Sequence, residues 1–440
     1  MRYCSGMKRT VLSLVCVAAL STAARADLKV CATCAAGVTE ALGPANASRV
    51  AQAFRPVNAS EVAQAFRPAN AARADLRVCA TCAGGVAEAL GPVNASEVAQ
   101  AFTPANAAQP AAENTTLTAV EGLKVGSVTL PGGTTGCTVI LVDGEGVPGG
   151  VSQRGGAPGT RETDLLNPLN MVDKVNAIVL SGGSAFGLDA ASGTSKWLEE
   201  HHIGWDVRVA KVPIVPAAIL FDLPIGDNAK THPGADCGYK AVEAATAAPV
   251  AMGTVGAGAG ATVGKMGGPG TSMKGGLGSA ALRMPNGLVV AAIVAVNAAG
   301  DILDPDTGKV IAGSRKPDGT FADARQLLRS GALLQRRGAT PRAVENTTIG
   351  LVATNARLTK AEVSRMALMA DDGYARAIFP SHTMGDGDTV FSLATGRWDG
   401  QADVSLIGAL AADAMARALV QAVTQATGLP NIPAVRDLKK

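Results

Sequence analysis

The sequence predicts a layered α/β fold for residues 113–440, and three observations carry that prediction. Several short runs are apolar throughout and end at Gly, Asn or Asp, as strands buried on both faces do; they include 137–143, 176–183, 288–297, 347–355 and 389–396. Helical patterns lie between these runs. The 440 residues also include 52 Gly, and only 3% are aromatic, which favours closely packed layers. Strands with helices on their outer faces form a layered α/β domain.

Two helices can be bounded from signals at their ends. Thr359 and Glu362 have the spacing of a capping box, which predicts a helix over 359–369. An Ala- and Leu-rich segment predicts a longer helix over 403–426, and Gly428 would follow its last turn.

The composition excludes several classes of protein. A hydrophobic content of 47% is too high for a disordered chain, and 8 Cys in 440 residues are too few for a disulfide scaffold. The 39 Lys and Arg residues nearly balance the 36 Asp and Glu residues, giving a net charge of +3 without a basic stretch. We therefore expect no nucleic-acid partner.

Residues 1–26 predict a secretion signal. Arg2, Lys8 and Arg9 precede an apolar run over 11–20, and Ala24-Arg25-Ala26 has the A-x-A pattern of a cleavage site. A run of about ten apolar residues is too short to span a hydrocarbon core of about 30 Å. We expect a periplasmic or secreted protein that leaves the membrane once the signal is removed, with a cytosolic chain that has an apolar start as the alternative.

Residues 27–112 predict a duplicated extension of low order. Residues 25–48 recur at 73–96, and recurring Pro residues limit any helix there to about two turns. Each copy carries a C-x-x-C, at Cys31/Cys34 and Cys79/Cys82. A shared zinc site or a redox pair would need a setting that the sequence does not show, so local disulfides or unused thiols are the simpler interpretation.

Two glycine-rich segments could line a pocket. Ser184 lies in SGGSAFG, but the closing Gly of a G-x-S-x-G nucleophile elbow is missing, and of the four His only His382 lies comfortably downstream. A Gly-rich turn that packs closely or lines a pocket is the alternative. The segment GAGAGATVGKMGG, over 256–268, fits neither the dinucleotide nor the Walker spacing. Its Lys265 could serve as a positive charge beside a backbone-lined cavity, where it would stabilise an anion, or as a neutral amine that helps to transfer a proton.

Two acidic residues directly precede the apolar run at 389–396. Asp386 and Asp388 lie two positions apart, where side chains of a strand point the same way. Two carboxylates aimed at one point could handle a proton or anchor an amine. A cation site would lack the remaining oxygen ligands of a calcium loop, and a solvated acidic turn is the other interpretation.

A hydroxyl residue stands at the head of another buried run. Thr347 lies in Glu345-Asn346-Thr347-Thr348, immediately before an apolar strand. The same four letters occur at 113–116, but no uniformly apolar strand follows them there.

Seven segments in order carry a family resemblance over about 113–440: VGSVTLPGGTTGCTVIL, LSGGSAFGLDAASG, VPAAILFDLPIGD, VGAGAGATVGKM, VAVNAAGDI, ENTTIGLVATN and GDGDTVF. Together they resemble the self-processing family of L-aminopeptidase/D-amidase-esterases, β-peptidyl aminopeptidases and the endo-type 6-aminohexanoate (nylon) oligomer hydrolase. The resemblance implies a four-layer α-β-β-α sandwich like that of N-terminal-nucleophile hydrolases. It also implies a precursor that cuts itself before a Ser or Thr.

Carried over by position, the resemblance implies cleavage between Asn346 and Thr347, which leaves an α-part over 113–346 and a β-part over 347–440. Thr347 would be the nucleophile. Asn297 matches the family residue that helps to hold the oxyanion, and Lys265 matches a Lys near the nucleophile of the nylon hydrolase.

The remaining site residues follow from the same resemblance. Asp386 and Asp388 match paired positions that face the nucleophile; the nylon hydrolase has Asp at both, whereas the aminopeptidases have Ser and Glu. Phe221 stands where better-studied relatives have Tyr, in an expected substrate pocket with Ser184. The resemblance implies a homo-oligomer of processed units, and we expect no cofactor and no metal.

The expected chemistry depends on whether the nitrogen of Thr347 is an amide or a free amine. A Thr hydroxyl is a weak nucleophile until a base takes its proton, and the nitrogen of Thr347 cannot be that base while it is an amide. Cleavage would free an α-amine with a pKa of about 7.7–8.0, beside its own hydroxyl. Asp386 and Asp388 would hold this amine and also raise its pKa.

We therefore expect an exported amide hydrolase that acts as an aminopeptidase or amidase on small peptides, amino-acid amides or β-peptides. Endo-hydrolysis of 6-aminohexanoate oligomers is one alternative, and the pair Asp386 and Asp388 leans towards it. A non-catalytic periplasmic binding protein is an alternative of another class.

Overall fold

The computed structural model describes residues 113–331, 333 and 346–438. The chain divides into two compact units, Met1–Ala112 and Glu113–Lys440. The predicted secretion signal, the duplicated extension and both C-x-x-C pairs lie outside the described residues.

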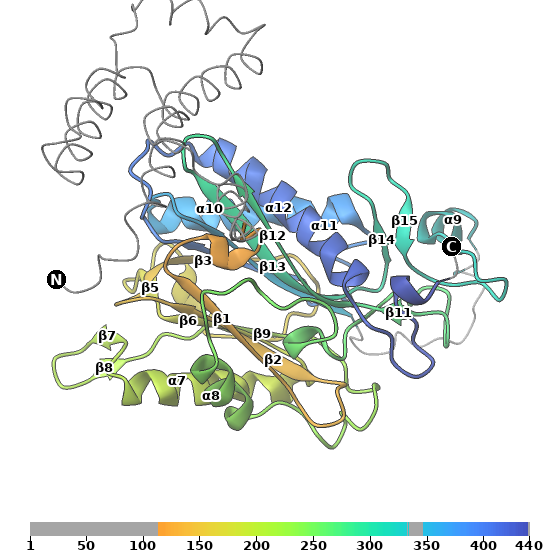
Figure 1. Cartoon of the computed structure of the whole chain (residues 1–440), viewed down its shortest axis with the longest axis horizontal. Helices are drawn as coiled ribbons and strands as arrows, with labels where there is room; N and C mark the ends of the chain where they lie inside the picture. Colours follow the sequence, from red (N-terminus) through yellow and green to blue (C-terminus); the bar gives the residue numbers. More distant parts are fainter. Residues whose placement is uncertain (1–112, 332, 334–345, 439–440) are drawn as a thin grey trace, which may run out of the picture. The chain divides into compact units, whose positions relative to one another are not determined.

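The first sheet has five strands in the order β1-β2-β6-β9-β4. Its outer face is covered by two helices, which lie along the lower edge of the molecule in Figure 1. The strands are β1 (Leu123–Thr129), β2 (Gly136–Val142), β4 (Thr160–Arg161), β6 (Ala177–Ser181) and β9 (Ala217–Ile219), and the helices are α7 (Ala190–Glu200) and α8 (Ala235–Glu243).

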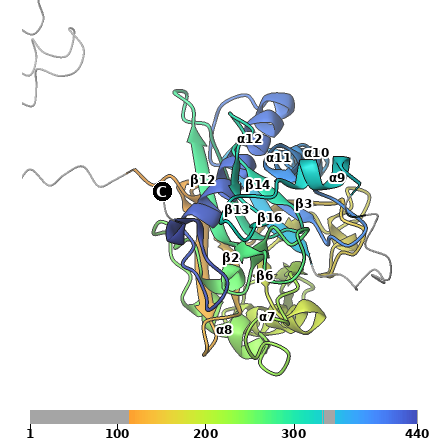
Figure 2. The same cartoon turned by 90° about the vertical axis from the view of Figure 1, so that its right-hand side faces the viewer.

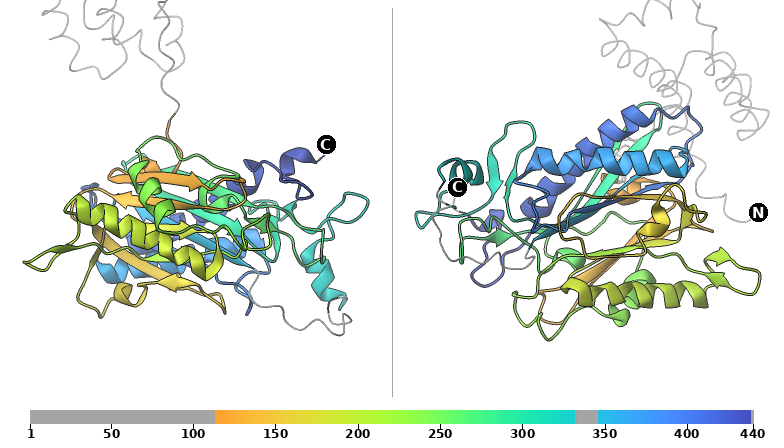
Figure 3. Two further views of the ribbon diagram at one scale, coloured as in Figure 1. Left: turned by 90° about the horizontal axis from the view of Figure 1, so that it is seen from below. Right: turned by 180° about the vertical axis from the view of Figure 1, so that it is seen from behind.

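The second sheet has six strands in the order β12-β13-β16-β18-β3-β5, and three helices cover its outer face. Figures 2 and 3 show this helical layer on the opposite side of the molecule from α7 and α8. The strands are β3 (Val147–Gln153), β5 (Lys174–Val175), β12 (Gly276–Arg283), β13 (Val289–Asn297), β16 (Thr347–Thr354) and β18 (Thr389–Ala394), and the helices are α10 (Lys360–Ala370), α11 (Asp372–Ala377) and α12 (Val404–Thr424).

Shorter elements connect these layers and extend one end of the second sheet. They are β7 (Trp205–Asp206), β8 (Lys211–Val212), β10 (Thr262–Val263), β11 (Met273–Lys274), β14 (Asp301–Leu303), β15 (Val310–Ala312), β17 (Ile378–Phe379), α9 (Ala324–Arg329) and the 3-10 turns η1 (Leu117–Ala119), η2 (Asp164–Leu166), η3 (Ser184–Asp189), η4 (Gly256–Gly258) and η5 (Val435–Asp437).

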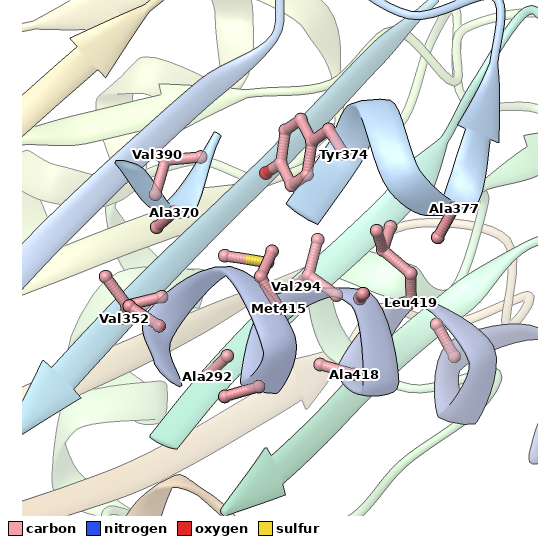
Figure 4. Close-up of a cluster of buried hydrophobic side chains, with 14 of the residues drawn as sticks. Ala292, Val294, Val352, Ala370, Tyr374, Ala377, Val390, Met415, Ala418 and Leu419 are labelled. Atoms are coloured by element: carbon pink, nitrogen blue, oxygen red, sulfur yellow. The ribbon is translucent and has the colours of Figure 1, made fainter. Parts of the chain in front are cut away.

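The described residues form three apolar clusters, one at each junction between layers. One lies between the two sheets, one between the first sheet and α7 and α8, and one between the second sheet and α10–α12. Figure 4 shows the last of these, where Met415 and Leu419 of α12 face Val294 of β13 and Val352 of β16. The architecture is therefore a four-layer α-β-β-α sandwich, and the predicted fold class is confirmed.

The continuous apolar runs follow from this layering. In β13, Val290, Ala292 and Val294 face the helical layer, whereas Ala291 and Ile293 face the other sheet. Successive side chains of a strand point to opposite faces, so a strand buried on both faces must be apolar at every position. The runs at 137–143, 176–183, 288–297, 347–355 and 389–396 correspond to β2, β6, β13, β16 and β18.

Both predicted helices are present. Thr359 caps α10 with Glu362 in a capping box, and the Asp403 side chain accepts hydrogen bonds at the start of α12. Helix α12 ends at Thr424, two residues before the predicted end, where Arg436 donates a hydrogen bond to the Thr424 carbonyl. Its length and composition would allow a membrane span, but much of its surface is buried against β12 and β13.

A disulfide joins β2 to α8, and close packing joins α7 to α8. A disulfide between Cys137 of β2 and Cys237 of α8 closes a loop of 100 residues, a pairing that the sequence analysis does not predict. Helices α7 and α8 approach so closely that a Cβ on Gly193 would lie 1.7 Å from the Ala235 carbonyl oxygen. The abundance of Gly thus reflects close contact between layers at this place.

Candidate active site

Three chain segments meet around Thr347. Thr347 opens β16 and is almost fully buried, at 1% exposed. On one side the antiparallel pairing places it opposite Asn297, the last residue of β13. On the other side a parallel bridge joins Asn346 to Asp386, just before β18. Residues 297, 347 and 386, far apart in the sequence, therefore lie together at one end of the second sheet.

The carbonyl group of Asn346 has two hydrogen-bond donors. The Gly387 N–H donates to its oxygen at 3.0 Å, and the Thr347 Oγ1 hydroxyl donates to it at 2.5 Å. A backbone N–H aimed at a carbonyl oxygen stabilises the negative charge that forms there during nucleophilic attack. The hydroxyl of Thr347 thus lies beside a polarised peptide bond.

Asn297 is fixed by two donors from the segment 256–268 and by one acceptor, the carbonyl group of Phe221. Its Oδ1 accepts hydrogen bonds from the Thr262 N–H at 3.0 Å and from Lys265 Nζ at 2.9 Å. Its Nδ2 donates to the Phe221 carbonyl oxygen at 2.9 Å. Lys265 therefore brings a positive charge to the end of β13 that pairs with Thr347, and these contacts set the orientation of the Asn297 amide.

The two acidic residues bind different backbone groups. Asp388 Oδ1 accepts a hydrogen bond from the Thr348 N–H at 2.8 Å, at the start of β16. Asp386 Oδ2 accepts from the Thr383 N–H at 2.7 Å within the preceding turn. Burial, and then the charge of Asp388, raise the pKa of Asp386, while Thr383 and Lys265 act in the opposite direction. Asp388 is thus the carboxylate tied to β16, and Asp386 shapes the turn.

The two expected pocket residues lie next to this cluster. The Ser184 N–H donates to the Leu220 carbonyl at 3.0 Å, and the next carbonyl, that of Phe221, accepts from Asn297. Ser184 and Phe221 are both half-buried. Ser184 has a φ of 54° at the start of η3, so it sits in a turn between strand and helix.

Sequence reasoning did not assign roles to Gly387, Asp371 or His382 in this site. A Cβ on Gly387 would lie 2.8 Å from Thr347 Oγ1, so a glycine is needed to seat the hydroxyl. His382 Nδ1 lies 3.0 Å from Asp388 Oδ2, and the fully buried Asp371 lies behind it. Desolvation raises the pKa of Asp371 to about 6, although Ser152, His382 and Arg154 oppose that shift. The sequence signal that could have indicated a role for His382 in this site is its position six residues before Asp388.

Between 113 and 438, leaving out the gaps at 332 and 334–345, no three side chains of His, Cys, Asp or Glu are grouped closely enough to hold a metal ion. The arrangement can instead present a hydroxyl to a peptide carbonyl, with an amide, a cation and two carboxylates around it.

The four-layer α-β-β-α sandwich is a form of the Ntn hydrolase fold. Among solved structures, the chain is similar to a Burkholderia sp. beta-aminopeptidase, with a TM-score of 0.54 and 20% identity over 73% of this chain and 89% of that one. It is also similar to the L-aminopeptidase D-Ala-esterase/amidase of Ochrobactrum anthropi, described as a variant of the Ntn hydrolase fold, with a TM-score of 0.53 and 18% identity over 73% and 90% of the two chains.

The sequence pattern of peptidase family S58 matches residues 115–433, and the chain belongs to this family. It is 43% identical over 322 residues to an uncharacterized aminopeptidase of Mycobacterium tuberculosis, covering 69% of this chain and 89% of the relative. It is 30% identical over 318 residues to a 6-aminohexanoate-oligomer endohydrolase of Agromyces sp., covering 68% and 84%. The protein is therefore an amide-bond hydrolase of the aminopeptidase and amidase type, which favours the enzyme over the non-catalytic binding protein.

Proposed function

We propose that this chain is an exported aminopeptidase that cuts its own Asn346–Thr347 bond and then uses Thr347 as its N-terminal nucleophile. The observation that carries the proposal is the contact of the Thr347 hydroxyl with the Asn346 carbonyl oxygen, which also accepts the Gly387 N–H. A nucleophile and its carbonyl held side by side convert a slow reaction between separate groups into an intramolecular one.

In the first step, Thr347 Oγ1 attacks the carbonyl carbon of Asn346. The bond from this carbon to the Thr347 nitrogen breaks, and the nitrogen takes up a proton to become a free amine. Water then hydrolyses the resulting ester, which leaves a carboxylate on Asn346 and restores the Thr347 hydroxyl. The Gly387 N–H supports the negative charge on the carbonyl oxygen in this step.

In the second step, the freed α-amine of Thr347 takes the proton of its own hydroxyl, which attacks the substrate carbonyl. Asp388, bound to the Thr348 N–H, lies beside this amine and holds the strand end. We assign the support of the developing oxyanion to Lys265 and Asn297, which are joined at 2.9 Å; Asn297 pairs with Thr347 across the two strands. In this proposal Asp388, Lys265 and Asn297 need not move after cleavage, because each acts from the position that it holds in the uncleaved chain.

The substrates that we propose are small peptides, amino-acid amides or β-peptides. Attack by an N-terminal amine and hydroxyl requires only an accessible carbonyl, so the site itself does not prefer one backbone. The second candidate is endo-hydrolysis of 6-aminohexanoate oligomers, favoured by the pair Asp386 and Asp388 and by the Agromyces relative.

Export and assembly are further parts of the proposal. The disulfide between Cys137 and Cys237 supports an oxidising compartment, because cytosolic proteins rarely keep structural disulfides. It agrees with the secretion pattern of residues 1–26. A homo-oligomer of processed units remains an expectation from the resemblance.

The test of self-cleavage is mass spectrometry of the purified full chain after a denaturing gel. We expect a fragment that begins at Thr347, and Thr347→Ala should abolish both this fragment and amide hydrolysis. Thr115→Ala is the matched control, because it changes the same residue type within the same four letters at an exposed position. Active protein whose Asn346–Thr347 bond is intact would refute the mechanism.

The substrate test compares alanyl-p-nitroanilide with a 6-aminohexanoate trimer, using processed enzyme. We expect the anilide to be hydrolysed with the higher kcat/KM. A preference for the trimer would replace the aminopeptidase proposal by the second candidate.

A further inference from the structure

Behind the nucleophile strand, an imidazole lies between two buried carboxylates. His382 Nδ1 is 3.0 Å from Asp388 Oδ2, and His382 Nε2 is 4.0 Å from Asp371 Oδ1. Asp388 is in turn hydrogen-bonded to the Thr348 N–H. The three side chains form a continuous row that ends at the residue next to Thr347.

The backbone holds His382 in this row. Its N–H donates to Asp388 Oδ2 at 3.0 Å, so Asp388 contacts both the backbone and the ring of the same residue. His382 has a φ of 56°, a left-handed conformation that non-Gly residues seldom adopt. Such a conformation persists where surrounding contacts determine it, and its side chain is only 17% exposed.

Other charged and titratable groups face the row from the adjoining elements. From the end of β3, Arg154 Nε lies 3.6 Å from Asp371 Oδ2 and its Nη1 lies 3.5 Å from the exposed carboxylate of Asp372. From α11, the Tyr374 ring stacks on His382, and burial raises the pKa of Tyr374 well above its usual value, so this phenol stays neutral. Asp386 lies close enough to Asp388 for the two charges to interact, and Lys265 acts on Asp386 with the opposite sign.

We propose that His382 is a positioning residue whose imidazolium offsets the negative charge of Asp388 beside Thr347. This inference rests on the proposed function, because it concerns the free amine that cleavage would create. Two carboxylates next to an α-amine stabilise its ammonium form, which cannot accept the hydroxyl proton. A cation bound to Asp388 weakens that effect and keeps more of the amine neutral near pH 7.

The surroundings favour the charged imidazole. Burial lowers the pKa of His382, but Asp388 and Asp371 together raise it by more, so its net direction is upward. The imidazolium therefore persists to higher pH than that of an unperturbed histidine, and it is lost as the pH rises through this raised value. While the imidazolium is present, it offsets the charge of Asp388.

The test is the pH dependence of kcat/KM in His382→Asn. Asn tolerates the left-handed backbone and carries an amide nitrogen near the place of Nδ1, but it has no charge. Without the cation the pKa of the amine rises, so the acidic limb of the profile moves to higher pH. We expect kcat/KM about 3- to 10-fold lower below that limb and unchanged above it.

The matched control is His202→Asn, since His202 is an exposed histidine with a φ of 57° at the end of α7. Its profile should equal that of the unmodified chain. Asp371→Asn removes the carboxylate behind His382 and should move the acidic limb in the same direction by a smaller amount. It provides the measurement if His382→Asn does not fold or is not processed.

Mass spectrometry of each variant separates the two proposals. If the unmodified chain lacks a fragment beginning at Thr347, the proposed function fails. If that fragment is present but the acidic limb stays in place, or kcat/KM falls equally at every pH, His382 does not offset the charge of Asp388 and this inference alone is overturned.

Discussion

At the scale of single residues, the site depends on how closely Gly387 approaches Thr347. The Gly387 N–H donates to the Asn346 carbonyl oxygen, and the missing side chain of Gly387 leaves room for the Thr347 hydroxyl. One glycine therefore supplies both a donor and the space in which the Thr347 hydroxyl lies.

We expect Gly387→Ala to slow self-cleavage by about 10²- to 10³-fold, the effect of losing one oxyanion donor. A Cβ at this position would lie 2.8 Å from Thr347 Oγ1 and 2.7 Å from the Ala157 carbonyl oxygen, so hydroxyl and donor must move apart. The measurement is the rate at which the fragment beginning at Thr347 accumulates after synthesis.

Gly385→Ala is the control for that prediction. A Cβ on Gly385 meets only Thr383 Oγ1, at 3.9 Å, and cleavage should proceed normally. Equal rates for both variants would show that crowding at Thr347 does not limit the reaction.

The letters ENTT occur at both 113–116 and 345–348, and comparing the two places shows what a sequence motif can and cannot specify at this scale. At 113–116 the Asn114 side chain accepts hydrogen bonds from Thr116, and a 3-10 turn begins at Leu117. The same letters at 345–348 run into β16. The apolar run that follows Thr347 distinguishes the two places, and it is legible in the sequence.

At the scale of elements, a buried lysine of β11 supports the glycine-rich segment beside the site. Lys274 Nζ donates hydrogen bonds to the carbonyl groups of Gly258, Ala261 and Gly275. The next residue after Ala261 is Thr262, whose N–H orients Asn297. Burial lowers the pKa of Lys274 to about 7, and the charge of Asp222 acts against this shift.

We expect Lys274→Met to lower the free energy of unfolding by about 1–3 kcal/mol near pH 9, because buried carbonyl groups lose their donor. Between pH 7 and about 10.4 the unfolded chain binds a proton at Lys274 that the folded chain does not, so this lysine contributes more stability as the pH rises. The loss should therefore be larger at pH 9 than at pH 6. Denaturant unfolding at both values measures it.

Lys360→Met is the matched control for the effect on catalysis. Lys360 Nζ also donates to three carbonyl groups, those of Leu165, Asn170 and Val172, but it opens α10 at the end away from Asp371. Both variants should lose stability, and Lys274→Met alone should reduce kcat/KM. Equal reductions in kcat/KM would contradict a specific link from Lys274 through Thr262 to Asn297.

At the scale of the whole molecule, the described unit is joined covalently at one place, between β2 and α8. The disulfide links the first sheet to the outer helical layer, whereas Thr347 lies in the second sheet. The disulfide therefore lies in a different sheet from Thr347.

We expect reduction of the bond between Cys137 and Cys237 to lower the free energy of unfolding by about 2–5 kcal/mol while leaving activity at low temperature unchanged. Thermal unfolding with and without dithiothreitol measures the change in Tm. The double variant Cys137→Ser/Cys237→Ser is the control, because its lower Tm should no longer respond to the reductant. A Tm that still falls with reductant would place the sensitive bond elsewhere in the chain.

The elements were predictable because their signals are local. Strands buried on both faces are apolar at every position, and the capping box of α10 lies within four residues, so β13, β16 and α10 could be bounded from the sequence. The disulfide could not, since Cys137 and Cys237 are 100 residues apart and neither pattern nor spacing pairs them.

The sequence by itself determined the layered α/β class, the strand that Thr347 opens and the residues that the family shares. Only the tertiary structure brought Asn297, Asp386 and Thr347 to one end of a sheet and placed His382 between Asp388 and Asp371. The physical reason is that periodicity and capping act between near neighbours in the chain. Strand order and side-chain contacts instead depend on which distant surfaces pack together.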